Sequence, residues 1–291
     1  SDSLRLATVT LLLAACSSGN TAPAGQPSPA PSAPRPTVDP MGVAPAGDFG
    51  IRYARSGAGI ARYALTRHDS VTATMPSGEI QVQVFGSTAY VTLTWVASDT
   101  GAKITAAVDS VVPDSGLSYV PAVLDSARGA RWTGLRRPTG RLADLTGGPS
   151  SLISDQVREQ IQLIFPLLPS DGVRPGVSWT DSTSGPVRVS AFEALEAVRV
   201  DSRAETSLTN SGALPIVVIR TRTAAGQGSQ FGQPITIRAT GSDTLSYHVA
   251  ADGRVLSVDG IRMTAMVVDL PSIGQSVSAQ QFSSLRMSLL R

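Results

Sequence analysis

Apolar and polar residues alternate with a period of two along much of the chain after residue 49, which is the pattern of strands that bury one face. In residues 89–95 the odd positions hold Ala, Val, Leu and Trp, and residues 80–84 alternate Ile or Val with Gln. Because Gly86-Ser87 separates these two runs, it predicts a tight hairpin turn. With a run on one parity over residues 63–75 and a weaker run over 104–111, the pattern predicts a four-stranded antiparallel meander over roughly residues 60–114.

A second meander is predicted after residue 177, with longer strands. Residues 235–249 keep apolar side chains on one parity, in a run that is broken at Gly241-Ser242-Asp243. Asp252-Gly253 is a hairpin signal, and strands near 198–208 and 214–224 complete the meander. The next strand has Ile261, Met263, Ala265 and Val267 on one face, and the last has Leu285, Met287 and Leu289.

Between the meanders the apolar period changes from two to that of a helix. Residues 151–165 carry one apolar stripe, Ser150 or Ser151 can cap its start, and Pro166 and Pro169 end it. A short helix over 118–127 and a hairpin over 131–145 are also predicted. The fold class is therefore α+β and predominantly antiparallel β, with two meanders forming one curved, half-barrel-like sheet and one or two packing helices. The globular domain is residues 49–291, with possible lobes 49–148 and 170–291 joined by a helix over 150–166.

The N-terminal residues predict export and a lipid anchor. Residues 6–15 are apolar but shorter than the ~20 residues that a membrane-spanning helix needs, and Arg5 precedes them. The segment Leu13-Ala14-Ala15-Cys16, which holds the single cysteine, resembles the lipobox of bacterial lipoproteins. That resemblance implies a signal peptide over residues 1–15, cleavage between Ala15 and Cys16, and lipidation of the Cys16 thiol. The alternatives are an ordinary signal peptide with an incidental cysteine, or a buried thiol.

Residues 16–48 predict a disordered tether, because eight prolines lie among Ala, Ser, Gly and Thr. We expect the protein in the cell envelope, held by membrane lipid through Cys16, with the periplasmic face of the outer membrane as the site. A net charge of +2 argues against a nucleic-acid partner.

The sequence offers little that predicts catalysis. His68-Asp69-Ser70 places three triad residue types in a row, but on a strand His68 and Asp69 point to opposite faces. His248 is expected on a polar strand face, and Glu193 and Glu196 have a helical spacing within a segment that favours a strand. No metal, cofactor or catalytic residue is predicted, and we expect the protein not to be an enzyme.

The lipobox, the Pro-rich tether and the meanders, with Pro-Gly-Val-Ser-Trp-Thr-Asp at 175–181, resemble an uncharacterised class of exported, β-rich bacterial lipoproteins. The layout is more distantly similar to the LolA/LolB lipoprotein carriers, whose curved half-barrel holds acyl chains; this likeness assigns no residue. It implies a hydrophobic ligand, a lipid or acyl chain, on the curved sheet. The alternative is a structural or interaction lipoprotein that has a fully packed core and binds an envelope protein. The candidate ligand-lining residues, which are otherwise ordinary core, are Trp95, Trp132, Trp179, Met263, Met266 and Met287.

Overall fold

The computed structural model describes residues 50–53, 58–114, 124–149, 151–189, 192–230 and 233–290. The predicted signal peptide, Cys16, the tether and most of the helix predicted over 118–127 lie outside these ranges, so those expectations remain predictions. No helix among the described residues is long and apolar enough to cross a membrane.

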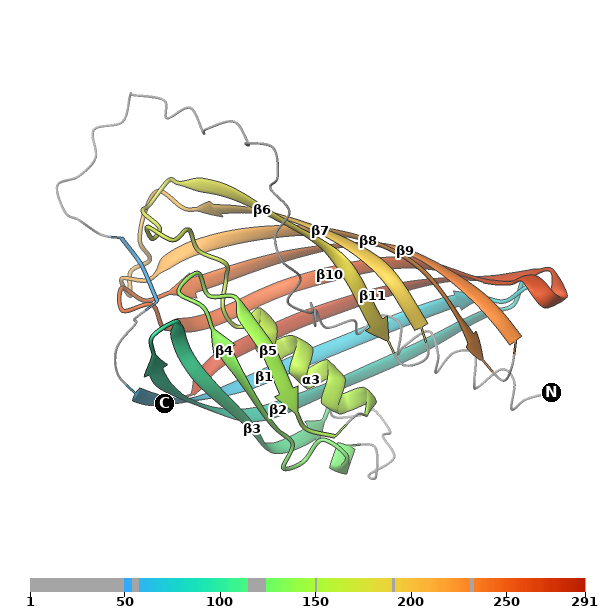
Figure 1. Ribbon diagram of the computed structural model, residues 1–291, viewed down its shortest axis with the longest axis horizontal. Coiled ribbons are helices and arrows are strands. Elements are labelled where there is room, and N and C mark those ends of the chain that lie inside the picture. The colour runs from blue at the N-terminus through green and yellow to red at the C-terminus, as the bar shows by residue number, and fades with distance from the viewer. Residues whose placement is uncertain are drawn as a thin grey trace.

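The described residues form one antiparallel sheet of 11 strands (Figure 1). Its spatial order is β5-β4-β3-β2-β1-β11-β10-β9-β8-β7-β6, so the first and last strands are neighbours and join two meanders. The predicted fold class is confirmed. The strands are β1 (Ala58–Thr74), β2 (Ile80–Ser98), β3 (Gly101–Pro113), β4 (Arg131–Arg136), β5 (Leu142–Gly147), β6 (Ser178–Val189), β7 (Phe192–Ala204), β8 (Leu214–Gln230), β9 (Gln233–Val249), β10 (Val255–Leu270) and β11 (Gln275–Leu290).

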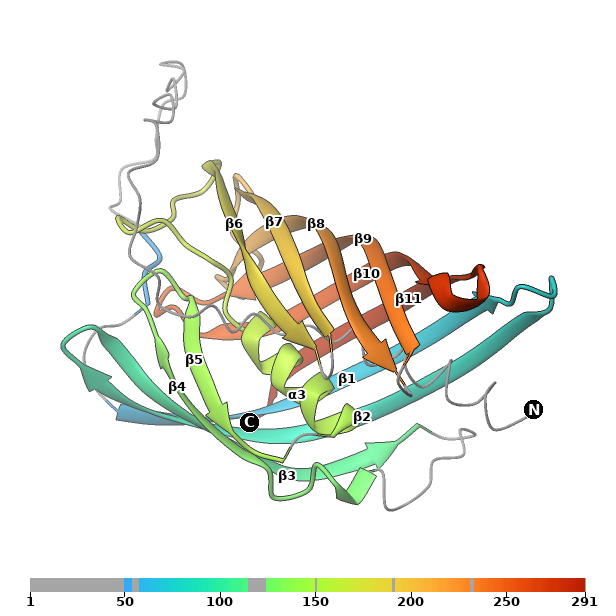
Figure 2. The same ribbon diagram turned by 45° about the vertical axis from the view of Figure 1, so that its right-hand side comes forward.

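The sheet curls around the helix α3 (Leu152–Leu163), which lies in its hollow (Figure 2). The Ser151 side chain caps the helix by accepting a hydrogen bond from the Ser154 N–H at 3.2 Å. The predicted apolar stripe faces the sheet, because Ile153, Val157 and Ile161 are all buried. The predictions of this helix and of its cap are confirmed. A short 3-10 helix, η1 (Pro271–Ile273), connects β10 to β11.

The segment over roughly residues 60–114 contains three strands, β1 to β3, in place of the predicted four, because Gly86-Ser87 does not form a turn. Gly86 lies inside β2, paired with His68 of β1. The carboxylate of Asp114 lies directly over it: a Cβ at Gly86 would come 1.9 Å from Asp114 Oδ2, which is 2.6 Å from His68 Nδ1. The glycine therefore permits a close approach within a continuous strand. The apolar run Ile80, Val82 and Val84 faces outward and is exposed.

The predicted break at Gly241-Ser242-Asp243 is also absent, and β9 runs through it. Asp243 has the same parity as the buried apolar residues of β9 and is itself fully buried. The interruption in the pattern therefore marks a polar residue on the inner face. The predicted turn at Asp252-Gly253 is confirmed between β9 and β10, and so is the hairpin of β4 and β5.

The inner face of the sheet carries two apolar clusters. The larger surrounds α3 and includes Leu65, Val91, Ile161 and Tyr247. The smaller lies toward the other end of the strands and includes Ile237, Met266 and Val277. Between them lies a set of buried charged side chains.

Candidate functional site

A row of buried and partly buried polar residues crosses five strands between the two apolar clusters. Strand pairing aligns Asp69 of β1, Ser283 of β11, Arg262 of β10, Asp243 of β9 and Arg220 of β8 in one register row. Paired residues in antiparallel strands point to the same side, so all five side chains face the hollow. We call this row, together with Arg67, Glu159, Arg222 and Gln281, the polar band.

Glu159 is the side chain by which α3 enters the polar band. Its Oε2 accepts a hydrogen bond from Arg67 Nη1 at 3.0 Å, and its Oε1 accepts a short one from Arg262 Nη1. Arg222 Nη1 lies 3.8 Å from the same Oε1. The carboxylate thus joins β1, β10 and β8 to the helix, and it is buried with its partners.

The remaining carboxylates of the band are also held by donors. Asp69 accepts hydrogen bonds from Arg67 Nε at 2.8 Å and from the Ser283 hydroxyl at 2.5 Å. Asp243 accepts hydrogen bonds from Arg262 Nε at 2.9 Å and from Arg222 Nη2 at 3.2 Å. Such pairing is what allows charges to be buried.

The electrostatic environment keeps two of these acids ionised. Burial by itself raises the pKa of Glu159, but the guanidinium groups of Arg262, Arg67 and Arg222 outweigh it and leave the pKa below its usual range. The pKa of Asp243 is lowered in the same way, with Arg262 and Arg222 outweighing burial. Both groups are therefore poor proton acceptors at neutral pH.

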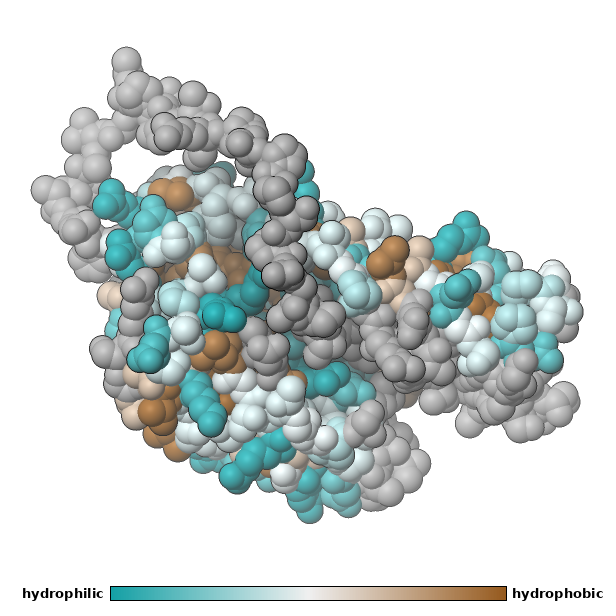
Figure 3. All heavy atoms as spheres, in the orientation of Figure 1, coloured by the Kyte–Doolittle hydropathy of each residue, from teal (hydrophilic) through white to brown (hydrophobic). Residues whose placement is uncertain are grey.

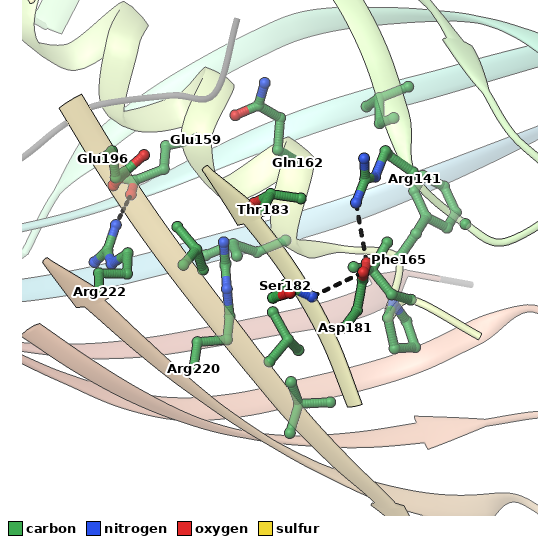
Figure 4. Close-up of a pocket in the computed structure, with 18 of the residues that line it drawn as sticks. Arg141, Glu159, Gln162, Phe165, Asp181, Ser182, Thr183, Glu196, Arg220 and Arg222 are labelled. Carbon is green, nitrogen blue, oxygen red and sulfur yellow. Dashed lines mark hydrogen bonds and ion pairs between the residues drawn. The ribbon is translucent and has the colours of Figure 1, made fainter. Parts of the chain in front are cut away.

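A cavity of about 200 Å³ opens beside the polar band (Figure 4). It lies between the C-terminal end of α3, the turn before β5, and strands β6, β7 and β8. The edge strands β5 and β6 both contribute to it, and an ion pair between Arg141 and Asp181 (3.0 Å) joins the two sides of its rim. The apolar part of its wall is Leu142, Leu163, Phe165, Pro166, Leu167, Pro186, Val198, Val200 and Val218.

Two arginines of β8 bring charge to the cavity wall. Arg222 is 10% exposed and is paired with Asp243, whereas Arg220 is 21% exposed. Among the described residues, no carboxylate oxygen lies closer to the Arg220 guanidinium than Asp243 Oδ2 at 3.9 Å, which is beyond hydrogen-bond distance. Arg220 is therefore the arginine of this region that lacks a close anionic partner.

Glu196 of β7 lies on the same wall. It is buried, and among the described side chains none forms a hydrogen bond or ion pair with it. Burial raises its pKa, and the nearby Arg222 and Arg220 only partly oppose that effect. In Figure 4 the Glu196 carboxylate lies next to that of Glu159, above Arg222. The cavity thus combines apolar walls with an under-paired arginine and an unpaired acid.

The six candidate ligand-lining residues do not line this cavity. Trp132 and Met287 are buried in the larger core cluster, and Met266 belongs to the smaller one. Trp95 and Trp179 are partly buried against the larger cluster, where Trp179 Nε1 donates a hydrogen bond to the Leu167 carbonyl at 2.8 Å. Met263 is 59% exposed on the outer face.

The residues considered for catalysis are dispersed. His68 and Asp69 do point to opposite faces: Asp69 lies in the polar band, while His68 is half exposed beside Asp114. His248 Nδ1 lies 3.0 Å from the Ser257 hydroxyl. Among the described residues, no group of three or more His, Cys, Asp or Glu side chains is arranged to hold a metal ion.

Sequence reasoning did not identify the polar band. A signal was present for three of its members, because Arg67, Asp69 and Asp243 have the parity of the buried apolar residues on their strands. Arg262 gave none, because the apolar run of β10 over residues 261–267 has the opposite parity. No protein-family model and no curated protein matches the chain. The polar band and its cavity are therefore the features from which a function is inferred.

Proposed function

We propose that this chain is a lipid-anchored, non-enzymatic protein of the cell envelope that binds a small hydrophobic ligand inside its curved sheet. The observation that carries the binding proposal is the cavity beside α3, with nine apolar residues in its wall. Each CH₂ group that a ligand buries there contributes roughly 0.8 kcal/mol. The anchor rests on the sequence Leu13-Ala14-Ala15-Cys16.

The cavity sets the size of the ligand. Pockets that bind drug-sized ligands have volumes of roughly 300–1,000 Å³, whereas this cavity measures about 200 Å³. The helix α3 and its core cluster fill the part of the hollow next to the cavity. We therefore expect one short alkyl chain, and not the set of long acyl chains that a lipoprotein carrier holds.

Binding is tested with 1-octanol as a neutral probe and the full chain carrying Cys16→Ser, which needs no detergent. We expect titration calorimetry to give saturable binding, and Val200→Phe, which places a larger side chain in the cavity wall, to abolish it. Val84→Phe, the same change on the exposed outer face, is the matched control and should bind normally. Absence of binding by the unsubstituted cavity, or equal binding by both Phe variants, overturns the proposal.

The anchor has its own test. In cells that export the protein, the unsubstituted chain should fractionate with membranes and carry acyl groups, and Cys16→Ser should do neither. A Cys16→Ser protein that remains acylated and membrane-bound contradicts the lipobox interpretation.

The second candidate function is protein interaction, which the outer face of the sheet favours. Phe282 of β11 and Met263 of β10 are paired neighbours there, and both are about half exposed. Figure 3 views the molecule from the side of α3, where hydrophobic residues lie between hydrophilic ones, so the outer face of β10 and β11 is on the far side of that view. The test places a photo-crosslinker at position 263 and, as a control, at the exposed turn residue Asp252. A defined adduct in cells at position 263 alone supports this function. No adduct at either position argues against it.

A further inference from the structure

The charged wall of the cavity suggests which kind of ligand the protein selects. We infer that the cavity binds an amphipathic monocarboxylate with a short alkyl chain, whose carboxylate pairs with Arg220 while the chain lies against the apolar wall. This inference rests on the proposed function, because it adds the head group to a hydrophobic ligand bound in the same cavity.

The carboxylate partners are unevenly distributed among the arginines of the polar band. Arg67 and Arg262 each contact two carboxylates, and Arg222 hydrogen-bonds Asp243. The carboxylates that hold these three arginines are Asp69, Glu159 and Asp243. Arg220 reaches only Asp243, at 3.9 Å, and Asp243 is already engaged by two other guanidinium groups. One guanidinium at the cavity wall thus retains donors for one more carboxylate.

The Arg220 side chain is accessible from the cavity. Its side chain remains 21% exposed, while Asp243 on the other side of it is fully buried. Arg220 is part of the cavity wall, as are Val198, Val200 and Val218 on its own and the neighbouring strand. Figure 4 shows its guanidinium rising from β8 toward Ser182 of β6. A ligand carboxylate at this point has its alkyl chain beside those valines.

One negative charge suits the balance of charged side chains around the cavity. Arg67, Arg220, Arg222 and Arg262 are balanced by Asp69, Glu159, Asp243 and Glu196 only when Glu196 is ionised. Glu196 is buried on the same wall and makes no ion pair with a described residue. When it holds its proton, the region carries one uncompensated positive charge, which a monocarboxylate neutralises. When it is ionised, Glu196 repels the ligand and competes for Arg220.

The experiment compares three probes of equal chain length: octanoate, 1-octanol and octylammonium. They are titrated into the full chain carrying Cys16→Ser. We expect octanoate to bind about tenfold to 100-fold more tightly than 1-octanol, which is the range of a hydrogen-bonded pair with a charged group, and octylammonium to bind most weakly. Arg220→Met should remove this preference and leave the affinity for 1-octanol within about threefold, which also shows that the variant is folded.

Two further variants make the test specific. Arg141→Gln removes an arginine from the rim of the same cavity, but one whose partner Asp181 is at 3.0 Å; it is the matched control and should keep the octanoate preference. Glu196→Gln removes the competing acid without changing its shape, and it should tighten octanoate binding and leave 1-octanol unaffected.

The outcomes separate the head-group inference from the proposed function. Equal affinity for octanoate and 1-octanol overturns the inference and leaves hydrophobic binding intact. A preference for octylammonium, or an octanoate preference that survives Arg220→Met, also overturns it. Failure of all three probes to bind overturns the proposed function, and the inference with it.

Discussion

Glu159→Gln is expected to lower the free energy of unfolding by about 3–5 kcal/mol, the cost of breaking a buried ion pair. The carboxylate accepts hydrogen bonds from Arg67 and Arg262, and Arg222 lies 3.8 Å away. A glutamine keeps the shape and one acceptor oxygen, but it directs an N–H₂ donor at a guanidinium. It also leaves buried positive charge uncompensated at the point where the helix meets the sheet.

The assay is equilibrium unfolding in urea, followed by circular dichroism, with the difference taken from the midpoint at an unchanged slope. Arg286→Gln is the control, because the Arg286–Asp259 pair is exposed on both sides (73% and 49%) and should contribute at most about 1 kcal/mol. If Glu159→Gln costs no more than this control, the buried network does not stabilise the docking of α3, and the reasoning fails.

The same variant makes a prediction about pH. The pKa of Glu159 in the folded protein lies below its usual value because Arg262, Arg67 and Arg222 outweigh the effect of burial. A lowered folded pKa contributes stability that is present above the unfolded pKa, about 4.3, and is lost as the pH falls through the folded pKa. The unsubstituted protein and Glu159→Gln should therefore converge in stability at acidic pH. A difference that stays constant down to that range contradicts the assignment.

Three other predictions concern separate parts of the molecule. Gly86→Val should lower the free energy of unfolding in urea by about 1–3 kcal/mol, because the Cβ of the new side chain meets the Asp114 carboxylate. An unchanged free energy of unfolding contradicts the close approach of Asp114 to Gly86. Trp132→Ala should cost about 3–5 kcal/mol and leave 1-octanol affinity unchanged, since Trp132 is core and not cavity wall; loss of binding in a folded variant restores it as a ligand-lining residue. Octanoate affinity, measured where octanoate is ionised, should fall as the pH rises through the raised pKa of Glu196. The charged groups around Glu196 are Arg220 and Arg222 of β8, Glu159 of α3 and Arg262 of β10. Glu196→Gln should abolish the pH dependence, and a fall in affinity that persists in this variant assigns the dependence to another group.

The period-two alternation predicted most of the strands, the helical period predicted α3, and residue types predicted the turn at Asp252-Gly253 and a cap at Ser150 or Ser151. These features are local, since a strand repeats every two residues, and a helix start is marked by one capping side chain. The same alternation was misread in two places. Apolar residues on the outer face of β2 suggested a separate strand, and the inward-pointing Asp243 suggested a break in β9.

What the sequence determined by itself is the element content and the antiparallel class of the fold. The tertiary structure decided the rest: the pairing of β1 with β11, the row from Asp69 to Arg220, and the arrival of Glu159 from the helix. Asp69 and Ser283 are separated by 214 residues yet share a hydrogen bond. Parity could place Arg67, Asp69 and Asp243 on the inner face, but the pattern along the chain does not show which opposite charge each one meets there. Strand pairing places these opposite charges beside one another on the inner face, and the docking of α3 adds Glu159, so that their burial is stable.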